Sequence, residues 1–184
     1  MIPQLKPPAL ETKYCAMGPE LALKEGVIEV YASLFGRPDQ GGDVVSQGAY
    51  ARSLARTDRP GGAVKMLWQH DPLHPIGVWT EIREDVRGLY VRGRILTDVA
   101  LGREALALLE AGAIDGLSIG YHTVRAEKLA EGGRKLLEVD LWEVSVVTFP
   151  MLPEARVHAP ASPADAALAE DLATVLTEAR SLIA

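Results

Sequence analysis

The residues best suited to chemistry surround a serine in the stretch 114–121, which reads IDGLSIGY. In an extended strand, Gly116, Ser118 and Gly120 share one face, while the apolar residues between them share the other. The apolar face can pack into a core, and the glycine face presents one hydroxyl with almost no bulk around it. A substrate backbone can then approach Ser118 closely, with Gly116 and Gly120 lining its site. The alternative interpretation is a glycine-rich strand end that carries an ordinary serine.

Two other residues could complete a site around Ser118. His70 ends a predicted strand in LWQHDP, beside an acid and before a proline-fixed turn, where catalytic groups are often held. Glu143 lies in VDLWEVSVV, the most apolar predicted strand, and a buried carboxylate there must be paired. Its partner is either an arginine, in a salt bridge, or an imidazole, which it would orient as the third member of a triad. Asp140 is expected to face the other way and ranks below Glu143.

A metal site is a weaker interpretation of the same region. His70 and His74 have the four-residue spacing of a helical zinc pair, but Pro72 and Pro75 argue against a helix there. We therefore expect neither a metal nor a cofactor.

A nucleophile elbow is a second competing interpretation. The pattern Gly116-x-Ser118-x-Gly120 matches the elbow of α/β-hydrolases, and His158 would then supply the base. That motif requires a sharp turn from a strand into a helix, whereas the sequence after Gly120 continues as a strand. The chain also lacks the regular alternation of strands and helices of that fold. An esterase-type hydrolase is therefore kept only as a rival hypothesis.

The composition is that of a globular domain. The 184 residues are 48% hydrophobic and 24% charged, which suits one domain with a sizeable core. The net charge of -6 argues against nucleic acid as a partner, because phosphate binding needs a basic face. The one cysteine, Cys15, excludes an internal disulfide. We expect no signal peptide and no membrane-spanning segment, and hence a soluble cytoplasmic protein.

Periodicity predicts an α+β fold dominated by antiparallel sheet, because about seven strands occur with two internal helices and no regular alternation. Asp98 is a candidate N-cap for the second helix, and Gly112 ends it. Pro72 and Pro75 are expected to break the chain after the strand that ends at His70. The expected strands are 13–17, 26–35, 63–70, 76–83, 89–96, 116–125 and 134–149, and the expected helices are 48–56, 99–111 and 164–183.

Four segments together resemble the prohead protease family, the capsid maturation proteases of tailed bacteriophages and related gene-transfer particles. They follow the family's order and cover roughly residues 20–158, so we divide the chain into a leader (1–25), a protease domain (26–158) and a linker with a C-terminal helix (159–184). The segments are 26–50 (GVIEVYASLF, then GDVV and GAY), 67–77 (LWQHD, then PIG), 116–121 (GLSIGY) and 141–150 (LWEVSVVT, then P).

The resemblance implies a serine endopeptidase that cleaves the scaffolding segment of the major capsid protein, and itself, inside the procapsid in the host cytoplasm. Ser118 matches the nucleophile, His70 the base and Glu143 the orienting acid. The family is similar to the herpesvirus assemblins, which implies a closed or nearly closed antiparallel β-barrel with peripheral helices, and a homodimer. Assemblins use a second histidine as the orienting residue, where this chain would use Glu143. Nucleic acid, membrane and cofactor have no part in this function.

A catalytically inactive, scaffold-like capsid assembly protein of the same fold is the main alternative. Such a protein would tolerate the loss of His70 or Ser118, and both residues are present. An active enzyme also needs backbone N–H donors for an oxyanion hole. We expect these donors in a turn after Pro150, near Arg156.

Overall fold

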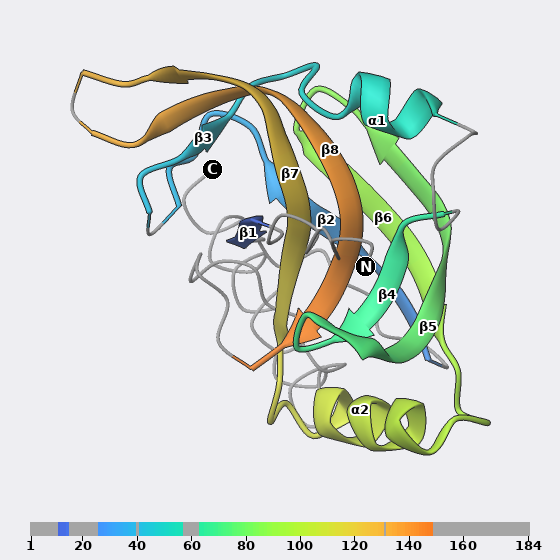
Figure 1. The fold of residues 1–184 in the computed structure, drawn as a ribbon. Coiled ribbons are helices and arrows are strands. Elements are labelled where there is room, and N and C mark those ends of the chain that lie inside the picture. Colours follow the sequence, from blue (N-terminus) through green and yellow to red (C-terminus); the bar gives the residue numbers. More distant parts are fainter. Residues whose placement is uncertain (1–10, 15–25, 40, 57–62, 131, 149–184) are drawn as a thin grey trace, which may run out of the picture.

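The computed structural model describes residues 11–14, 26–39, 41–56, 63–130 and 132–148. These residues form one strongly curved sheet of eight strands, with a helix at each of two opposite ends (Figure 1). Neither helix of this described part is long and apolar enough to cross a membrane. The elements are β1 (Glu11–Tyr14), β2 (Val27–Leu34), β3 (Val44–Val45), α1 (Ala51–Ala55), β4 (Lys65–Trp68), β5 (Asp71–Glu84), β6 (Gly88–Ile95), α2 (Ala100–Glu110), β7 (Gly116–Lys128) and β8 (Arg134–Val147).

Strand β8 is the centre of the sheet. It pairs antiparallel with β7 on one side and parallel with β4 on the other, and β3 pairs in parallel with its first residues. Figure 1 shows β7 and β8 side by side as one long bent hairpin. The end of β8 is a continuous buried run from Glu143 to Val147, as is typical of a strand covered on both faces. Residues on β7 and β4 are therefore brought together across β8.

The remaining strands extend the sheet from β4. Strands β5 and β6 form the expected hairpin, and β2 pairs antiparallel with β6 at the end of the strand order. Strand β1 pairs antiparallel with β7 at the other end. Apolar side chains from the strands and both helices meet in one core, whose fully buried members include Ile28, Tyr50, Met66, Leu89, Leu109, Ile119, Leu136, Leu141 and Val144.

The expectation that Pro72 and Pro75 break the chain is wrong. Strand β5 begins at Asp71 and runs through both prolines. Its pairing with β6 starts only at Gly77, so the segment with the prolines has no ladder partner on that side. Proline lacks a backbone N–H and is tolerated in a strand where no partner needs that donor.

Two other structural expectations also differ from the structure. Asp98 is not the N-cap of α2, because the cap position is Val99, which makes no side-chain cap bond. The described strands form an open sheet of mixed direction rather than an antiparallel barrel, since β3 and β4 run parallel to β8. Alternation of apolar residues predicts that a segment is a strand, but it carries no information on the direction of its neighbour. The α+β class itself is confirmed by the two helices and the strand-rich sheet.

Candidate active site

Two neighbouring strands, and the turn that follows a third, carry the residues that the sequence singled out. Ser118 on β7 lies directly opposite Ser145 on β8, and Ser145 is the register partner of Leu67 on β4. Strand β4 ends at Trp68, so His70 follows two residues later at the same end of β8. Glu143 lies two residues before Ser145, on the same face of β8. The fold therefore gathers the three candidate residues at one end of the β7–β8–β4 group.

His70 is the partner of the buried Glu143 carboxylate. The Nδ1 atom of His70 lies 2.5 Å from Oε1 of Glu143. The Glu143 side chain is 3% exposed and the His70 side chain 18% exposed, so this contact is largely shielded from water. Of the two partners that the sequence left open for Glu143, the structure selects the imidazole. A carboxylate at Nδ1 holds the proton on that nitrogen and leaves Nε2 as the basic atom of the ring.

A left-handed turn after β4 aims the His70 ring. Gln69 has a φ of 53° and His70 a φ of 63°, both in the region that non-glycine residues seldom adopt. The Gln69 backbone N–H donates to the Val146 carbonyl at 2.9 Å. The Gln69 side chain binds Thr148, with Nε2 donating to Oγ1 at 2.7 Å and Oε1 accepting from the backbone N–H at 3.3 Å. The turn is thus fastened to the end of β8.

Ser145 contacts both members of the His70–Glu143 pair. Its hydroxyl donates to Oε2 of Glu143 at 2.5 Å, and its oxygen accepts the backbone N–H of His70 at 3.2 Å. Ser145 has no exposed surface. Ser145 follows Glu143 by two residues, but the sequence alone gives no reason to assign it a role, because cross-strand register is not visible in a sequence.

The Ser118 side chain lies on the same face, but its hydroxyl makes no hydrogen bond to the residues that the structure describes. Its hydroxyl is fully buried, and its register partner is Ser145. The structure therefore joins His70 to Glu143 and places Ser118 on the adjacent strand, without a Ser118–His70 hydrogen bond. Such bonds often form only when substrate is bound.

The two glycines beside Ser118 differ in their surroundings. Gly120 is the register partner of Glu143, and a Cβ atom at Gly120 would overlap with the Glu143 carboxylate. The space above Gly120 is thus taken by Glu143. Gly116 begins β7 and pairs with Val147 at the end of β8.

Other candidates of the sequence lie elsewhere. His74 contacts the Asp71 carboxylate at 2.7 Å on an exposed surface and does not join His70. Within the described ranges, no group of three or more His, Cys, Asp or Glu residues is arranged to hold a metal ion. Cys15, Pro150, Arg156, His158 and the predicted helix 164–183 lie outside the described residues.

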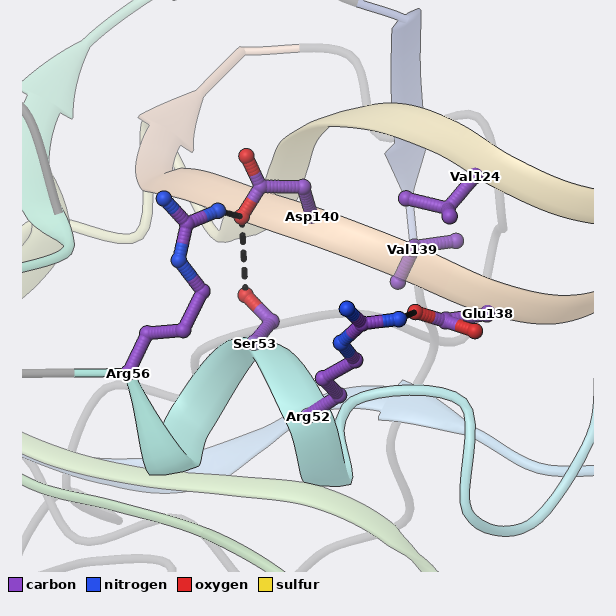
Figure 2. Close-up of a pocket in the computed structure, with 7 residues that line it drawn as sticks. All are labelled: Arg52, Ser53, Arg56, Val124, Glu138, Val139 and Asp140. Atoms are coloured by element: carbon purple, nitrogen blue, oxygen red, sulfur yellow. Dashed lines mark hydrogen bonds and ion pairs between the residues drawn. The ribbon is translucent and has the colours of Figure 1, made fainter.

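Asp140 lines a separate cavity of about 420 Å³ between α1 and β8. Figure 2 shows Ser53 of α1 and Arg56, which follows the helix, reaching the Asp140 carboxylate at 3.3 and 3.5 Å, while Arg52 of α1 pairs with Glu138 at 3.2 Å. Trp142 also donates its indole N–H to Asp140 at 2.9 Å. Asp140 was expected on the face opposite Glu143, because side chains alternate along a strand. A register shift between Gly120 and Tyr121, opposite this part of β8, interrupts that alternation. Ser53, Arg56 and Trp142 thus hold the carboxylate of Asp140, and the guanidinium of Arg56 balances its charge.

A serine on β7, a carboxylate on β8 and a histidine in the turn after β4 suit the class of serine hydrolases, and the comparisons agree with that class. The sequence model of the family described as caudovirus prohead serine protease matches residues 14–169. The prohead protease of Enterobacteria phage HK97 is 32% identical over 139 residues, which are 74% of this chain and 60% of that protein. The capsid polyprotein of Pseudomonas phage PAJU2 is 30% identical over 101 residues, which are 51% of this chain and 15% of that protein.

A solved structure shares the fold. The capsid assembly protease gp21 of bacteriophage T4 superposes with a TM-score of 0.60 at 17% identity, covering 79% of this chain and all of that chain. The family match spans most of the sequence, and the chain belongs to the caudovirus prohead serine protease family. The resemblance stated from the sequence is confirmed. The chain matches 60% of the length of the HK97 relative.

Proposed function

We propose that this chain is the serine endopeptidase of capsid maturation, with Ser118 as nucleophile, His70 as base and Glu143 as orienting acid. The observation that carries the proposal is the shielded contact between His70 Nδ1 and Glu143 Oε1, beside the strand that bears Ser118. Membership of the family and likeness to the HK97 prohead protease support the same activity.

The reaction begins when Ser118 Oγ attacks the carbonyl carbon of a peptide bond. The hydroxyl proton passes to Nε2 of His70 as the new C–O bond forms. The C–N bond then breaks, and the leaving amine takes that proton from the imidazolium. Water hydrolyses the acyl-enzyme with His70 again as base and Ser118 as leaving group. The negative charge of Glu143 stabilises the imidazolium in both halves of the reaction.

The proposed substrates are the scaffolding segment of the major capsid protein and the protease itself. Names of the relatives support this choice, since one is a prohead protease and another a capsid polyprotein. Cleavage takes place inside the procapsid, in the host cytoplasm. The proposed homodimer rests on the resemblance of the family to the assemblins alone.

Co-expression with the capsid protein encoded beside this chain tests the proposal. Intact masses of both proteins are compared for the wild type, Ser118→Ala, His70→Ala and Ser33→Ala. Ser33 is a matched control, because it is also a buried serine whose hydroxyl makes no hydrogen bond to described residues, but it lies on β2. We expect an N-terminal capsid segment to be lost with the wild type and Ser33→Ala only.

Identical masses in all four samples contradict an endopeptidase and favour the inactive, scaffold-like alternative. His158→Ala separates the remaining rival. Full cleavage by this variant agrees with His70 as base, whereas loss of cleavage supports an esterase-type arrangement of Ser118 with His158.

A further inference from the structure

A single buried hydroxyl connects the two residues proposed to activate the nucleophile. Ser145 Oγ donates to Glu143 Oε2 at 2.5 Å and accepts the backbone N–H of His70 at 3.2 Å. We propose that Ser145 is a positioning residue, which fixes the Glu143 carboxylate and the left-handed turn at His70 relative to each other. This role rests on the function proposed above for His70 and Glu143.

The hydrogen bonds of the carboxylate leave little freedom for it to rotate. Oε1 of Glu143 faces the imidazole and Oε2 receives the Ser145 hydroxyl, so both oxygens have directed contacts. Replacing Ser145 by alanine would leave Oε2 and the His70 N–H each without this partner. Glu143 is 3% exposed, so water does not readily take the place of the hydroxyl. The carboxylate can then turn, and the ring it orients turns with it.

Gly120, on the neighbouring strand β7, forms the other side of the site that holds the carboxylate, which we call its seat. A Cβ atom at Gly120 would overlap with the carboxylate and the Cγ atom of Glu143. The absence of a side chain at Gly120 therefore leaves the room in which the Glu143 carboxylate contacts His70. Ser145 from β8 and Gly120 from β7 thus hold one group from two sides, next to Ser118.

Steady-state kinetics on a peptide that spans the mapped capsid cleavage site test this role. We expect Ser145→Ala to lower kcat about ten- to hundredfold with KM unchanged, because misplacement of a catalytic group slows the chemical step without weakening binding. Ser145→Thr retains the hydroxyl and is expected to recover most of kcat. Ser33→Ala again serves as the control for loss of a buried serine.

A double-mutant cycle with Glu143→Gln shows whether Ser145 acts through Glu143. The loss caused by Ser145→Ala should largely vanish in the Glu143→Gln background, because the group being positioned is no longer a carboxylate. Equal losses in both backgrounds, or wild-type kcat for Ser145→Ala, overturn the role. If Ser145→Ala does not fold, Gly120→Ala disturbs the same seat from β7 and takes its place in the cycle.

The proton on Nδ1 of His70 gives a readout that needs no activity. In the wild type, a short bond to Glu143 predicts a strongly downfield proton resonance for this N–H. Ser145→Ala should move or broaden that resonance, and an unchanged resonance overturns the positioning role. A wild type that shows the resonance but cleaves nothing contradicts the proposed function instead.

A second observation, independent of Ser145, concerns the outer edge of β7. Strand β1 pairs there with the residues around the nucleophile, Tyr14 opposite Ser118 and Thr12 opposite Gly120. Strand β8 takes the other edge. A peptide often binds a protein by adding a strand to an exposed sheet edge. At Ser118 that edge is already occupied by the chain itself.

Side-chain contacts at the start of β1 fasten it in this place. Glu11 Oε2 lies 2.6 Å from Nη2 of Arg134, and Glu11 Oε1 accepts the backbone N–H of Thr123 at 3.1 Å. Arg134 is itself paired with Asp43 at 2.5 Å. Burial raises the pKa of Glu11, but the hydrogen bonds from Thr123 and Arg134 outweigh it, so the pKa lies below the ordinary value. A four-residue edge strand needs such additional contacts to stay paired.

We infer that β1 is an autoinhibitory strand, which competes with the substrate peptide for the edge of β7 at Ser118. Hydrolysis then requires β1 to leave that edge. The contacts of Glu11 determine the fraction of molecules in which β1 is detached. This inference rests on Ser118 being the nucleophile.

The variant Glu11→Ala tests the inference, with Glu138→Ala as the control that removes an ion pair to Arg52 elsewhere. We expect Glu11→Ala to raise kcat/KM about threefold to tenfold, within the range of one partly exposed ion pair and its hydrogen bonds. Hydrogen exchange at residues 11–14 should quicken in parallel. Faster exchange with unchanged or lower kcat/KM overturns autoinhibition and makes β1 a structural strand. Faster exchange without any Ser118-dependent hydrolysis contradicts the proposed function.

Discussion

At the scale of single residues, the candidate site depends on two consecutive residues with unusual backbone angles. Gln69 and His70 both have positive φ, and the bonds of Gln69 to Val146 and Thr148 hold them there. A non-glycine residue in this region is strained and persists only when its surroundings determine it. The structure thus stabilises this turn for the placement of one ring.

The first prediction concerns Gln69. Gln69→Ala removes both side-chain bonds to Thr148 while leaving the backbone strain in place. We expect kcat to fall about tenfold, because the His70 ring loses its defined position. The melting temperature should fall by only a few degrees, since the side chain is exposed. Gln47→Ala, an exposed glutamine far along the chain from this turn, is the control, and equal kcat values for the two variants would contradict the prediction.

The residues of the candidate site were predictable to the extent that their chemistry is local. A carboxylate in the apolar segment around Glu143 must have a partner, and a histidine at a strand end is a natural one. The roles of Ser145 and Gly120 depend on which residues face each other across β7 and β8. Register of that kind is set by the assembled sheet, and single residues in a sequence do not encode it.

At the scale of elements, segments of regular alternation were predicted well and their pairing was not. The hairpin of β5 and β6 and the long strands β7 and β8 follow the sequence pattern. The parallel pairing of β3 and β4 with β8 could not be predicted in this way. Strand β3 has only two residues, which is too short for a pattern of alternation, and alternation does not indicate the direction of a neighbouring strand. The prediction that Pro72 and Pro75 break the chain was wrong because it also depended on strand pairing. A proline interrupts a strand only where the partner strand needs a backbone N–H donor at that position.

The turn between β5 and β6 carries the second prediction. Asp85 accepts hydrogen bonds from the Tyr31 hydroxyl at 2.7 Å, from Arg83 at 2.7 Å and from the backbone N–H of Arg87 at 2.8 Å. Burial alone would raise the pKa of Asp85, but these bonds outweigh it and lower the pKa to about 2, from 3.8. Because the folded state has the lower pKa, the stabilisation is complete well above pH 3.8 and is lost as the pH falls toward 2.

Urea unfolding of Asp85→Asn and the wild type measures this effect. The difference in free energy of unfolding between them should be clearly smaller at pH 3 than at pH 7, because protonation removes the same charge that the substitution removes. Asp98→Asn, at an exposed aspartate before α2, is the control. A difference that stays constant between the two pH values would show that Asp85 does not stabilise the turn as a carboxylate.

At the scale of the whole molecule, one strand serves both the fold and the site. Strand β8 contributes buried residues to the core through Leu141, Val144 and Val146, and on its other face it carries Glu143 and Ser145. Strands β7 and β4 pair with it on either side and bring Ser118 and His70. The candidate site therefore forms when the centre of the sheet forms, whereas β1 is added at the edge.

Hydrogen exchange monitored by mass spectrometry gives the last prediction. Amides of residues 141–147, and those amides of residues 116–121 that bond to β8, should exchange only through global unfolding, because they lie in the buried centre of the sheet. Amides of residues 11–14 belong to a short edge strand and should exchange through local opening, with a lower free energy. Such a difference means that β1 can leave the edge of β7 while His70, Glu143 and Ser145 keep their arrangement. Equal protection in β1 and β8 would instead mean that the edge at Ser118 opens only when the whole sheet unfolds, and a substrate strand could not then exchange with β1 in the native protein.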